Sequence, residues 1–282
     1  MKYFIVDAFT SEPFGGNPAG VVMLEQGHDF PADTLMQQVA AEFRYSETAF
    51  VRRDGEREFT VHYFTPCSEV DLCGHATIAT FSTLCQTGMV PRGTVCLNHT
   101  LAGDLEVRVD RQVMMQMAAP RVIPADIDTA RLHRIMAGDS TAFTTRLPVE
   151  IVSTGLPDII MPIDSVEALH LMRPDMDALA ALSRQLNVTG VHAFALGNDG
   201  YTAHVRNFGP LYGVPEESAT GTANAALTHY LLRHGIITAD AHNSFLQGEA
   251  MQRPSVVATS IINGTIYVGG EACIIAHGTL LL

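Results

Sequence analysis

Basic residues are scarce in this sequence of 282 residues, and they form no cluster. Lysine and arginine total 17 against 30 aspartates and glutamates, so the formal net charge is −13. Binding to nucleic acid depends on grouped Lys and Arg side chains that neutralise phosphates. Nucleic acid is therefore excluded as an expected partner.

Long apolar runs are also missing. The first apolar stretch spans four residues before Asp7, which is too short for a signal peptide, and no run approaches the ~18 residues of a membrane span. The five cysteines are odd in number and spread along the chain, which favours reduced thiols over a disulfide framework. We expect a cytoplasmic protein without a membrane partner.

What the sequence does contain is typical of a globular protein. Apolar residues make up 47% and charged residues 17%, without any low-complexity tract. A chain of this length forms one large domain or two of ordinary size.

An internal repeat favours two domains. Segments 31–43 and 174–186, 143 residues apart, both have the apolar spacing of an amphipathic helix. Each is followed by a short run typical of a strand, "SETAFV" at 46–51 and "VHAFAL" at 191–196. The alternative is a chance likeness between two stretches of mixed α and β structure.

The repeat continues into a second pair of helices. These are expected to begin at Gly74 and Gly221, 147 residues apart, and to end at Gly88 and Gly235 in left-handed C-caps. Residues 103–117 read as a hairpin that turns near 110–112, followed by a crossover at 118–126. We predict two α+β domains of one fold, related by an approximate two-fold axis, with both helix starts in a shared cleft.

Paired helix starts predict an anion-binding site. A helix N-terminus presents unpaired N–H groups and the positive end of the helix dipole, and glycine lets a ligand approach closely. Gly74 and His75 on one side, with Gly221 and Thr222 on the other, would hold a carboxylate. The alternatives are glycines that only permit tight packing and a histidine with a structural hydrogen bond.

Two other chemistries are weaker candidates at this position. Cys67, Cys73 and His75 have the spacing C-x5-C-x-H, which lacks the paired C-x2-C of structural zinc sites, so no metal is expected. Cys73 with His75 as nucleophile and base is the second candidate. Side chains two residues apart at a helix start diverge, so the two need not touch each other.

One carboxylate breaks the symmetry of the repeat. Counting back from Phe50 and its counterpart Phe194 places Glu47 opposite Val191, so an acid is present on one side only. Glu47 is a candidate proton shuttle if it lies in the cleft. The alternative is a solvated glutamate at the end of a strand.

Five segments together resemble the PhzF family of phenazine biosynthesis-like proteins: "VDAFTSEPFGGNPAGVV" at 6–22, "SETAFV", "FTPCSEVDLCGHATIAT" at 64–80, "GVPEESATGTANAAL" at 213–227 and "GGEACIIAHGTLLL" at 269–282. The resemblance implies the diaminopimelate epimerase-like fold, in which each of two similar α+β domains is a barrel-like sheet around a central helix. It also implies that the C-terminal strands return to the first domain. The expected domains are therefore 1–118 with 267–282, and 119–266.

The resemblance also implies an activity. Family members are cofactor-free isomerases that move a proton along a cyclic hydroxy-amino acid, and "SETAFV" makes Glu47 the acid and base. Gly74, His75, Gly221 and Thr222 then contact an anionic substrate. No metal or organic cofactor is implied, and a homodimer is suggested.

This chain departs from the family pattern in one motif. "EESATGT" stands where the family has an "EDxATGS" pattern, so Glu217 replaces an aspartate and Thr222 a serine. The carboxylate and the hydroxyl are kept, but the longer side chain of Glu217 changes the reach of the carboxylate by ~1.5 Å, one C–C bond. The substrate of the known family members is therefore in doubt for this chain.

Two other functions remain open. Epimerase relatives use two opposed cysteines, and here Cys73 occupies the first place but Thr220 the second; a hydroxyl is far less acidic than a thiol. A Cys73-dependent amino-acid epimerase is thus one alternative. A metabolite-binding protein without catalysis is the other.

Overall fold

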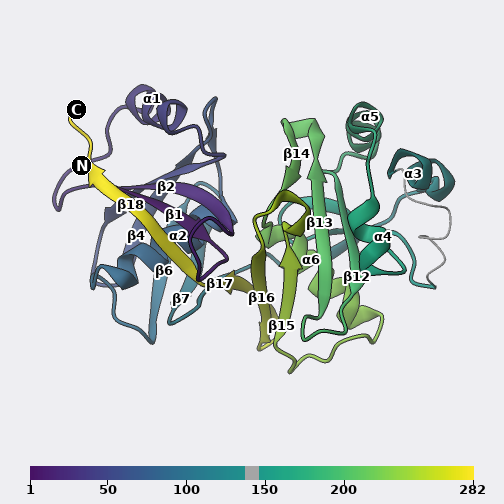
Figure 1. Ribbon diagram of the computed structural model, residues 1–282. Helices are drawn as coiled ribbons and strands as arrows, with labels where there is room; N and C mark the ends of the chain where they lie inside the picture. Colours follow the sequence, from purple (N-terminus) through teal and green to yellow (C-terminus); the bar gives the residue numbers. More distant parts are fainter. Residues whose placement is uncertain (137–145) are drawn as a thin grey trace. The chain divides into compact units, whose positions relative to one another are not determined.

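The structure is a computed structural model that describes residues 1–136 and 146–282, and the chain divides into two compact units (Figure 1). The first comprises Met1–Gln116 and Gly269–Leu282, and the second comprises Met117–Val268. These limits lie two residues from the domain boundaries expected from the sequence.

The first unit is built around one mixed sheet. Its elements are β1 (Lys2–Ala8), β2 (Asn17–Met23), α1 (Asp33–Phe43), β3 (Thr48–Arg53), β4 (Glu58–Phe64), β5 (Glu69–Val70), α2 (Gly74–Gln86), β6 (Thr94–Thr100), β7 (Gly103–Val109), β8 (Val113–Gln116) and β18 (Ala272–Thr279). Neighbouring strands follow the order β18, β1, β2, β3, β4, β6, β7, β8, with β2–β3 and β4–β6 parallel. The C-terminal strand β18 thus completes the sheet beside β1.

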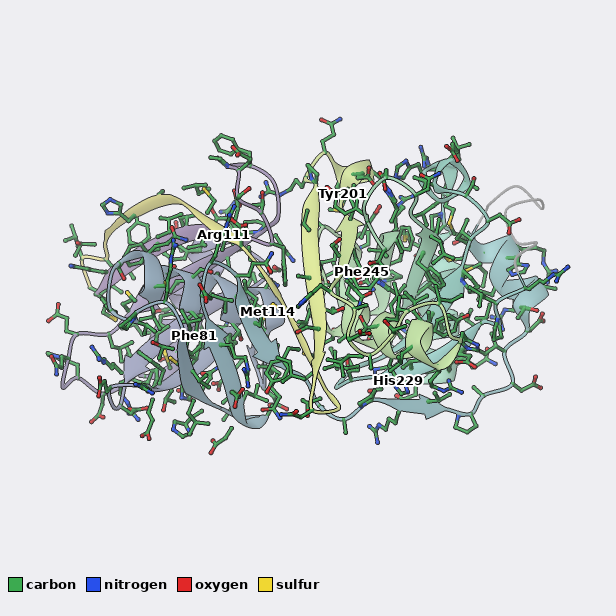
Figure 2. The ribbon with its side chains drawn as sticks, turned by 90° about the horizontal axis from the view of Figure 1, so that it is seen from below. Phe81, Arg111, Met114, Tyr201, His229 and Phe245 are labelled. Atoms are coloured by element: carbon green, nitrogen blue, oxygen red, sulfur yellow. The ribbon has the colours of Figure 1, made fainter. Side chains whose placement is uncertain are left out.

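Helix α2 forms the core of the first unit. It packs against β1, β2, β3, β7, β8 and β18, and its residues are buried without a break from His75 to Leu84. Figure 2 labels Phe81 of α2 among the side chains of this unit. A helix buried on every face must satisfy its polar side chains internally, and the hydroxyl of Thr77 donates to the Cys73 carbonyl at 2.6 Å.

The second unit repeats this plan. Its elements are β9 (Arg121–Ile123), α3 (Thr129–Met136), β10 (Glu150–Ser153), β11 (Pro157–Pro162), α4 (Val166–Leu171), α5 (Met176–Leu186), β12 (Val191–Leu196), β13 (Ala203–Gly209), η2 (Pro210–Tyr212), β14 (Val214–Glu217), α6 (Gly221–Arg233), β15 (Asn243–Gln247), η3 (Glu249–Met251), β16 (Ser255–Ile262) and β17 (Thr265–Gly270). The strand order is β9, β10, β11, β12, β13, β15, β16, with β11–β12 and β13–β15 parallel. Helix α6 packs against β10, β11 and β16.

The sequence repeat is confirmed as a structural repeat. Helices α1 and α5 have 11 residues each, and α2 and α6 have 13 residues each, beginning at Gly74 and Gly221 as predicted. Gly88 and Gly235 have φ angles of 77° and 69°, so both helices end through a left-handed glycine. The predicted hairpin is β7–β8, where the N–H of Asp110 donates to the Gln112 carbonyl.

The alignment at Glu47 needs a correction. Its structural counterpart is Gly190, and not Val191. The Glu47 carbonyl accepts from the Gly20 N–H, and the Gly190 carbonyl accepts in the same way from the Ile159 N–H. The register shifts by one because the connection from Leu196 of β12 to Ala203 of β13 is one residue longer than that from Arg53 of β3 to Phe59 of β4.

This correction explains why the carboxylate is present on one side only. A Cβ atom at Gly190 would lie 1.7 Å from the carbonyl oxygen of Phe208, which belongs to the backbone of β13. The second unit therefore has no room for any side chain at the position that Glu47 occupies in the first.

Candidate active site

The first unit brings Glu47 and His75 together. Glu47 precedes β3 and His75 lies in the first turn of α2, and their side chains are 20% and 4% exposed. His75 Nε2 is 3.3 Å from Glu47 Oε2 and 3.2 Å from Ser46 Oγ. The predicted solvent-exposed alternative for Glu47 is wrong, since its carboxylate rests against a buried imidazole.

The carboxylate oxygen beside the ring is unusual. Glu47 Oε2 has almost no exposed surface and no hydrogen-bond partner within the described parts of the chain. Its distance to His75 Nε2 is that of an ion pair, but the direction does not meet the criteria for a hydrogen bond. A buried acceptor without a donor is costly, and it is suited to receive a proton from a ligand.

Cys73 and His75 do touch, which corrects the sequence-based expectation. Cys73 Sγ lies 3.4 Å from His75 Nδ1. The expectation assumed helical geometry at both residues, whereas Cys73 is the N-cap and has extended backbone angles, φ −136° and ψ 121°. This conformation turns the thiol back toward the imidazole, so one ring nitrogen faces sulfur and the other faces Glu47.

In the second unit, the equivalent helix start is polar. Thr220 is the N-cap of α6, and its hydroxyl donates to Glu217 Oε2 at 2.6 Å. Gln247 at the end of β15 holds both residues, because its side-chain amide donates to the Glu217 carbonyl at 2.8 Å and to Thr220 Oγ1 at 3.0 Å. Gly221 is buried, and the Thr222 carbonyl accepts from Thr154 Oγ1 at 2.9 Å.

A series of buried, hydrogen-bonded side chains continues from this helix start into the interior. Asn224 Nδ2 donates to Gln247 Oε1 at 2.9 Å, and Asn224 Oδ1 lies 3.3 Å from His192 Nε2. His192 Nδ1 in turn lies 3.3 Å from Asn207 Nδ2. Since an amide nitrogen only donates, the ring must accept at Nδ1 and carry its proton on Nε2.

Burial changes the pKa values of His192 and Asp158, at the inner end of this series of side chains. Complete burial lowers the pKa of His192 to about 4, so its ring is neutral near pH 7. Burial also raises the pKa of Asp158 to about 7, against a smaller opposing effect of its hydrogen bond with Asn207. Asp158 Oδ1 has no hydrogen-bond partner among the described residues. Burial therefore favours the protonated form of this acid.

The predicted site residues fall into two groups. Glu47, Gly74 and His75 surround the start of α2, and Glu217, Gly221 and Thr222 surround the start of α6. The sequence analysis missed the support given to each group. Ser46, His192 and Asn224 lie inside segments quoted there but were given no role, and Gln247 and Asn207 lie outside those segments. The buried polar residues of β12 and α6 are the signal that points to this support.

Among the residues that the structure describes, two groups of side chains have the donor atoms of a metal site. One consists of Glu47, Cys73 and His75, and the other of His170, His204 and Glu249; within each group the donor atoms lie within 4.8 Å of one another. The first coincides with the candidate active site. The sequence analysis expected no metal and did not single out the second.

Fold and site together define the class of protein. Two repeats of a mixed sheet around a buried helix, joined along one chain, are the diaminopimelate epimerase-like fold. A carboxylate beside an imidazole at one helix start provides groups of the kind that acid–base catalysis uses. The class is that of isomerases with this fold.

Comparison with known proteins assigns the family. The model of the phenazine biosynthesis-like proteins, PhzC-PhzF, matches residues 6–278, and the chain belongs to this family. The uncharacterized isomerase YfhB of Bacillus subtilis is 34% identical over 255 residues, covering 88% of this chain and 84% of YfhB. The trans-2,3-dihydro-3-hydroxyanthranilate isomerase of Pseudomonas chlororaphis is 29% identical and covers 99% of both chains. The protein is thus an isomerase.

A solved structure agrees with the fold. The phenazine biosynthesis protein of the PhzF family from Bacillus anthracis has a TM-score of 0.88 at 24% identity, with 100% of this chain and 99% of that chain covered. Among the helices that the structure describes, none combines the length and the apolar character needed to cross a membrane.

Proposed function

We propose that the protein is a cofactor-independent isomerase of the PhzF type in which Glu47 moves a proton on a small carboxylated metabolite. The observation that carries this proposal is the buried oxygen of Glu47, which has no hydrogen-bond donor among the described residues and lies 3.3 Å from the His75 ring. A carboxylate in this state gains a partner when it takes a proton from a substrate carbon.

The neighbours of Glu47 support its part as both acid and base. His75 Nε2 lies 3.3 Å from Glu47 Oε2, and Cys73 Sγ lies 3.4 Å from His75 Nδ1, so polar groups stand beside the carboxylate in the buried site. After the transfer, the protonated acid returns the proton to another carbon of the substrate. Neither step needs Cys73 as a base.

The substrate class follows from charge and from one relative. Helix starts bearing Gly74 and Gly221 favour a carboxylate, and the similar Pseudomonas chlororaphis protein is named for an isomerisation of a dihydro-hydroxyanthranilate. We propose a cyclic hydroxy-amino acid or a comparable small carboxylated metabolite. We propose that Glu217, which accepts a hydrogen bond from Thr220, recognises the polar substituents of this substrate.

The test begins with a ligand. Small carboxylated metabolites that bind the native protein raise its melting temperature by mass action, and each such ligand is then incubated with enzyme in heavy water and followed by NMR. We expect a bound ligand to change isomer and to gain deuterium at carbon. Binding without any exchange would identify a metabolite-binding protein. Loss of exchange in Cys73→Ser would identify the cysteine-dependent epimerase.

A second prediction concerns how the start of α6 binds the carboxylate of the ligand. Gly221→Val places side-chain atoms at the start of α6 and should weaken anion binding in a calorimetric titration, because the ligand can no longer approach the backbone. Thr222→Val removes only the hydroxyl, and since the Thr222 carbonyl keeps its bond to Thr154, the fold should persist. Unchanged affinity in both folded variants would contradict the predicted contact.

Three further properties of the protein are part of this proposal. Both helix starts acting on one substrate molecule, a cytoplasmic location and a homodimer continue to be predictions. Light scattering of the purified protein tests the dimer. A substrate complex in which only one helix start contacts the ligand would contradict the shared site.

A further inference from the structure

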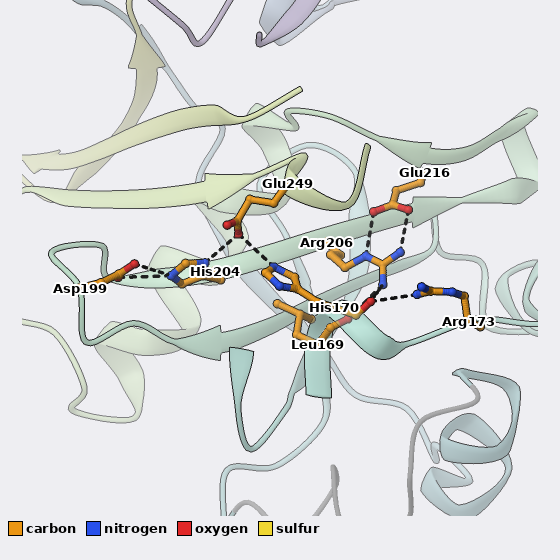
Figure 3. A network of polar contacts seen from close by, with 8 residues as sticks. All are labelled: Leu169, His170, Arg173, Asp199, His204, Arg206, Glu216 and Glu249. Atoms are coloured by element: carbon orange, nitrogen blue, oxygen red, sulfur yellow. Dashed lines mark hydrogen bonds and ion pairs between the residues drawn. The ribbon is translucent and has the colours of Figure 1, made fainter. Parts of the chain in front are cut away.

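A second group of titratable side chains in the second unit takes no part in the proposed reaction. The His–Glu cluster consists of His170 from α4, His204 from β13 and Glu249 from η3 (Figure 3). Asp199, in the loop before β13, lies behind His204. Figure 3 shows the two rings turned toward one carboxylate, so three elements distant in sequence meet at this point.

A single oxygen lies at the centre of the cluster. Glu249 Oε2 is 2.7 Å from His204 Nδ1 and 3.1 Å from His170 Nε2. The opposite nitrogen of His204, Nε2, is 3.2 Å from both carboxylate oxygens of Asp199. His204 therefore has a carboxylate against each of its ring nitrogens.

Carboxylates against both ring nitrogens favour a positive charge at His204. A neutral imidazole carries one N–H, and a carboxylate can only accept. If the N–H of His204 points to Asp199, two lone pairs face each other across the 2.7 Å between Nδ1 and Glu249 Oε2. A second ring proton relieves that repulsion, and so does a metal ion that binds both atoms.

We propose that His170, His204 and Glu249 bind a divalent transition metal ion, with Zn²⁺ as the reference ion. Two imidazoles and one carboxylate are a donor set of zinc sites with three protein ligands, whereas Mg²⁺ and Ca²⁺ prefer oxygen donors. With metal–ligand distances of about 2.0–2.2 Å, ligand atoms around a tetrahedral ion are ~3.4 Å apart. The separations of 2.7 and 3.1 Å need only a small outward movement.

Asp199 supplies the outer partner that such a site needs. A metal-bound histidine commonly donates its other N–H to a carboxylate, which fixes the ring and its tautomer. Asp199 does this for the buried His204, whose side chain is 6% exposed. The His170 and Glu249 side chains are 36% and 29% exposed, which gives an ion access and leaves a fourth position for water.

The site would also affect the segment that holds the start of α6. Glu249 follows Gln247 by two residues, and Gln247 bonds to Thr220 and to the Glu217 carbonyl. Gly248 between them has φ 80°, and a Cβ there would come within 2.7 Å of the Ser218 carbonyl oxygen. An ion on Glu249 would therefore anchor the strand end that orders Glu217.

The test uses the full chain, freed of metal with a chelator and then titrated with ZnCl2 in a calorimeter. We expect the His–Glu cluster to bind one Zn²⁺ per protein chain, and we expect a higher melting temperature when the site is saturated. Loss of a residue that only hydrogen-bonds to a metal ligand lowers metal affinity by ~10–100-fold, and Asp199→Asn should weaken Zn²⁺ binding by this amount. His204→Ala removes a ligand itself and should weaken binding by more. His99→Ala, which alters a surface histidine paired with Asp104, is the matched control and should bind normally.

Two further variants keep the proposal open to refutation. His170→Ala changes a half-exposed residue and should weaken binding even if His204→Ala fails to fold. Cys73→Ser reports on the other group of donor atoms, around Glu47 and His75. Zinc binding that survives His170→Ala but is lost in Cys73→Ser would overturn the proposal, and so would the absence of binding to the wild-type protein.

Discussion

Glu47→Gln should reduce the turnover of the proposed isomerase by ~10²–10⁴-fold, the usual contribution of a positioned general base. The substitution keeps the size of the side chain and its place beside His75, but it removes the oxygen that takes the proton. Substrate binding should change little, because in the proposed site the helix starts, and not Glu47, bind the carboxylate of the substrate. Exchange of the substrate proton in heavy water, measured by NMR, separates the two effects.

The control for this variant is Glu42→Gln. Glu42 is an exposed residue of α1, five positions before Glu47 in the chain, so its loss of charge should leave exchange at the wild-type rate. If Glu47→Gln also exchanges at that rate, another group is the base. Cys73, in contact with His75, and Glu217, bonded to Thr220, are then the next residues to replace.

The stability of the protein should depend on Asp158 in a defined direction. Burial raises the pKa of this acid to about 7 from its usual 3.8, so the folded protein binds a proton that the unfolded chain has released. Its contribution is fully present below pH 3.8 and is lost as pH rises through about 7. A shift of this size corresponds to at most about 4 kcal/mol of unfolding free energy.

Asp158→Asn removes this dependence, since an amide has no proton to lose. Relative to wild type, the variant should become more stable as pH rises from 5 to 9 in urea unfolding experiments. His192 titrates in the same unit with a pKa lowered to about 4, and it acts equally in both proteins. The exposed Asp177 provides the control, because Asp177→Asn should differ from wild type by a constant amount over this range. A flat difference for Asp158→Asn as well would show that the acid is ionised throughout.

Much of the fold follows from local patterns in the sequence. The apolar spacing in 31–43 and 174–186 predicts α1 and α5, and the paired glycines predict where α2 and α6 begin and end. These features are local, since a helix face and a C-cap depend on residues a few positions apart. Their order along the chain was sufficient to predict two copies of one fold.

The details that the sequence did not predict depend on residues far apart in the chain. The equivalence of Glu47 and Gly190 depends on hydrogen bonds to β2 and β11. The additional residue between β12 and β13 shifts the sequence alignment by one and conceals this equivalence. The His–Glu cluster joins residues 170, 204 and 249, whose spacing matches no metal-binding motif. Contact between Cys73 and His75 depended on the backbone angles of one N-cap residue, which the motif does not specify.

The close approach of Gly190 to the backbone of β13 bears on the stereochemistry of the proposed reaction. If Glu47 alone removes and returns the proton, as proposed, it would work on one face of the substrate and the transfer would be suprafacial. A second base of the same kind cannot arise in the other unit by point mutation, because any side chain at Gly190 would collide with the carbonyl of Phe208. Inversion through two opposed bases would therefore need a second base at another position, such as Thr220 at the start of α6.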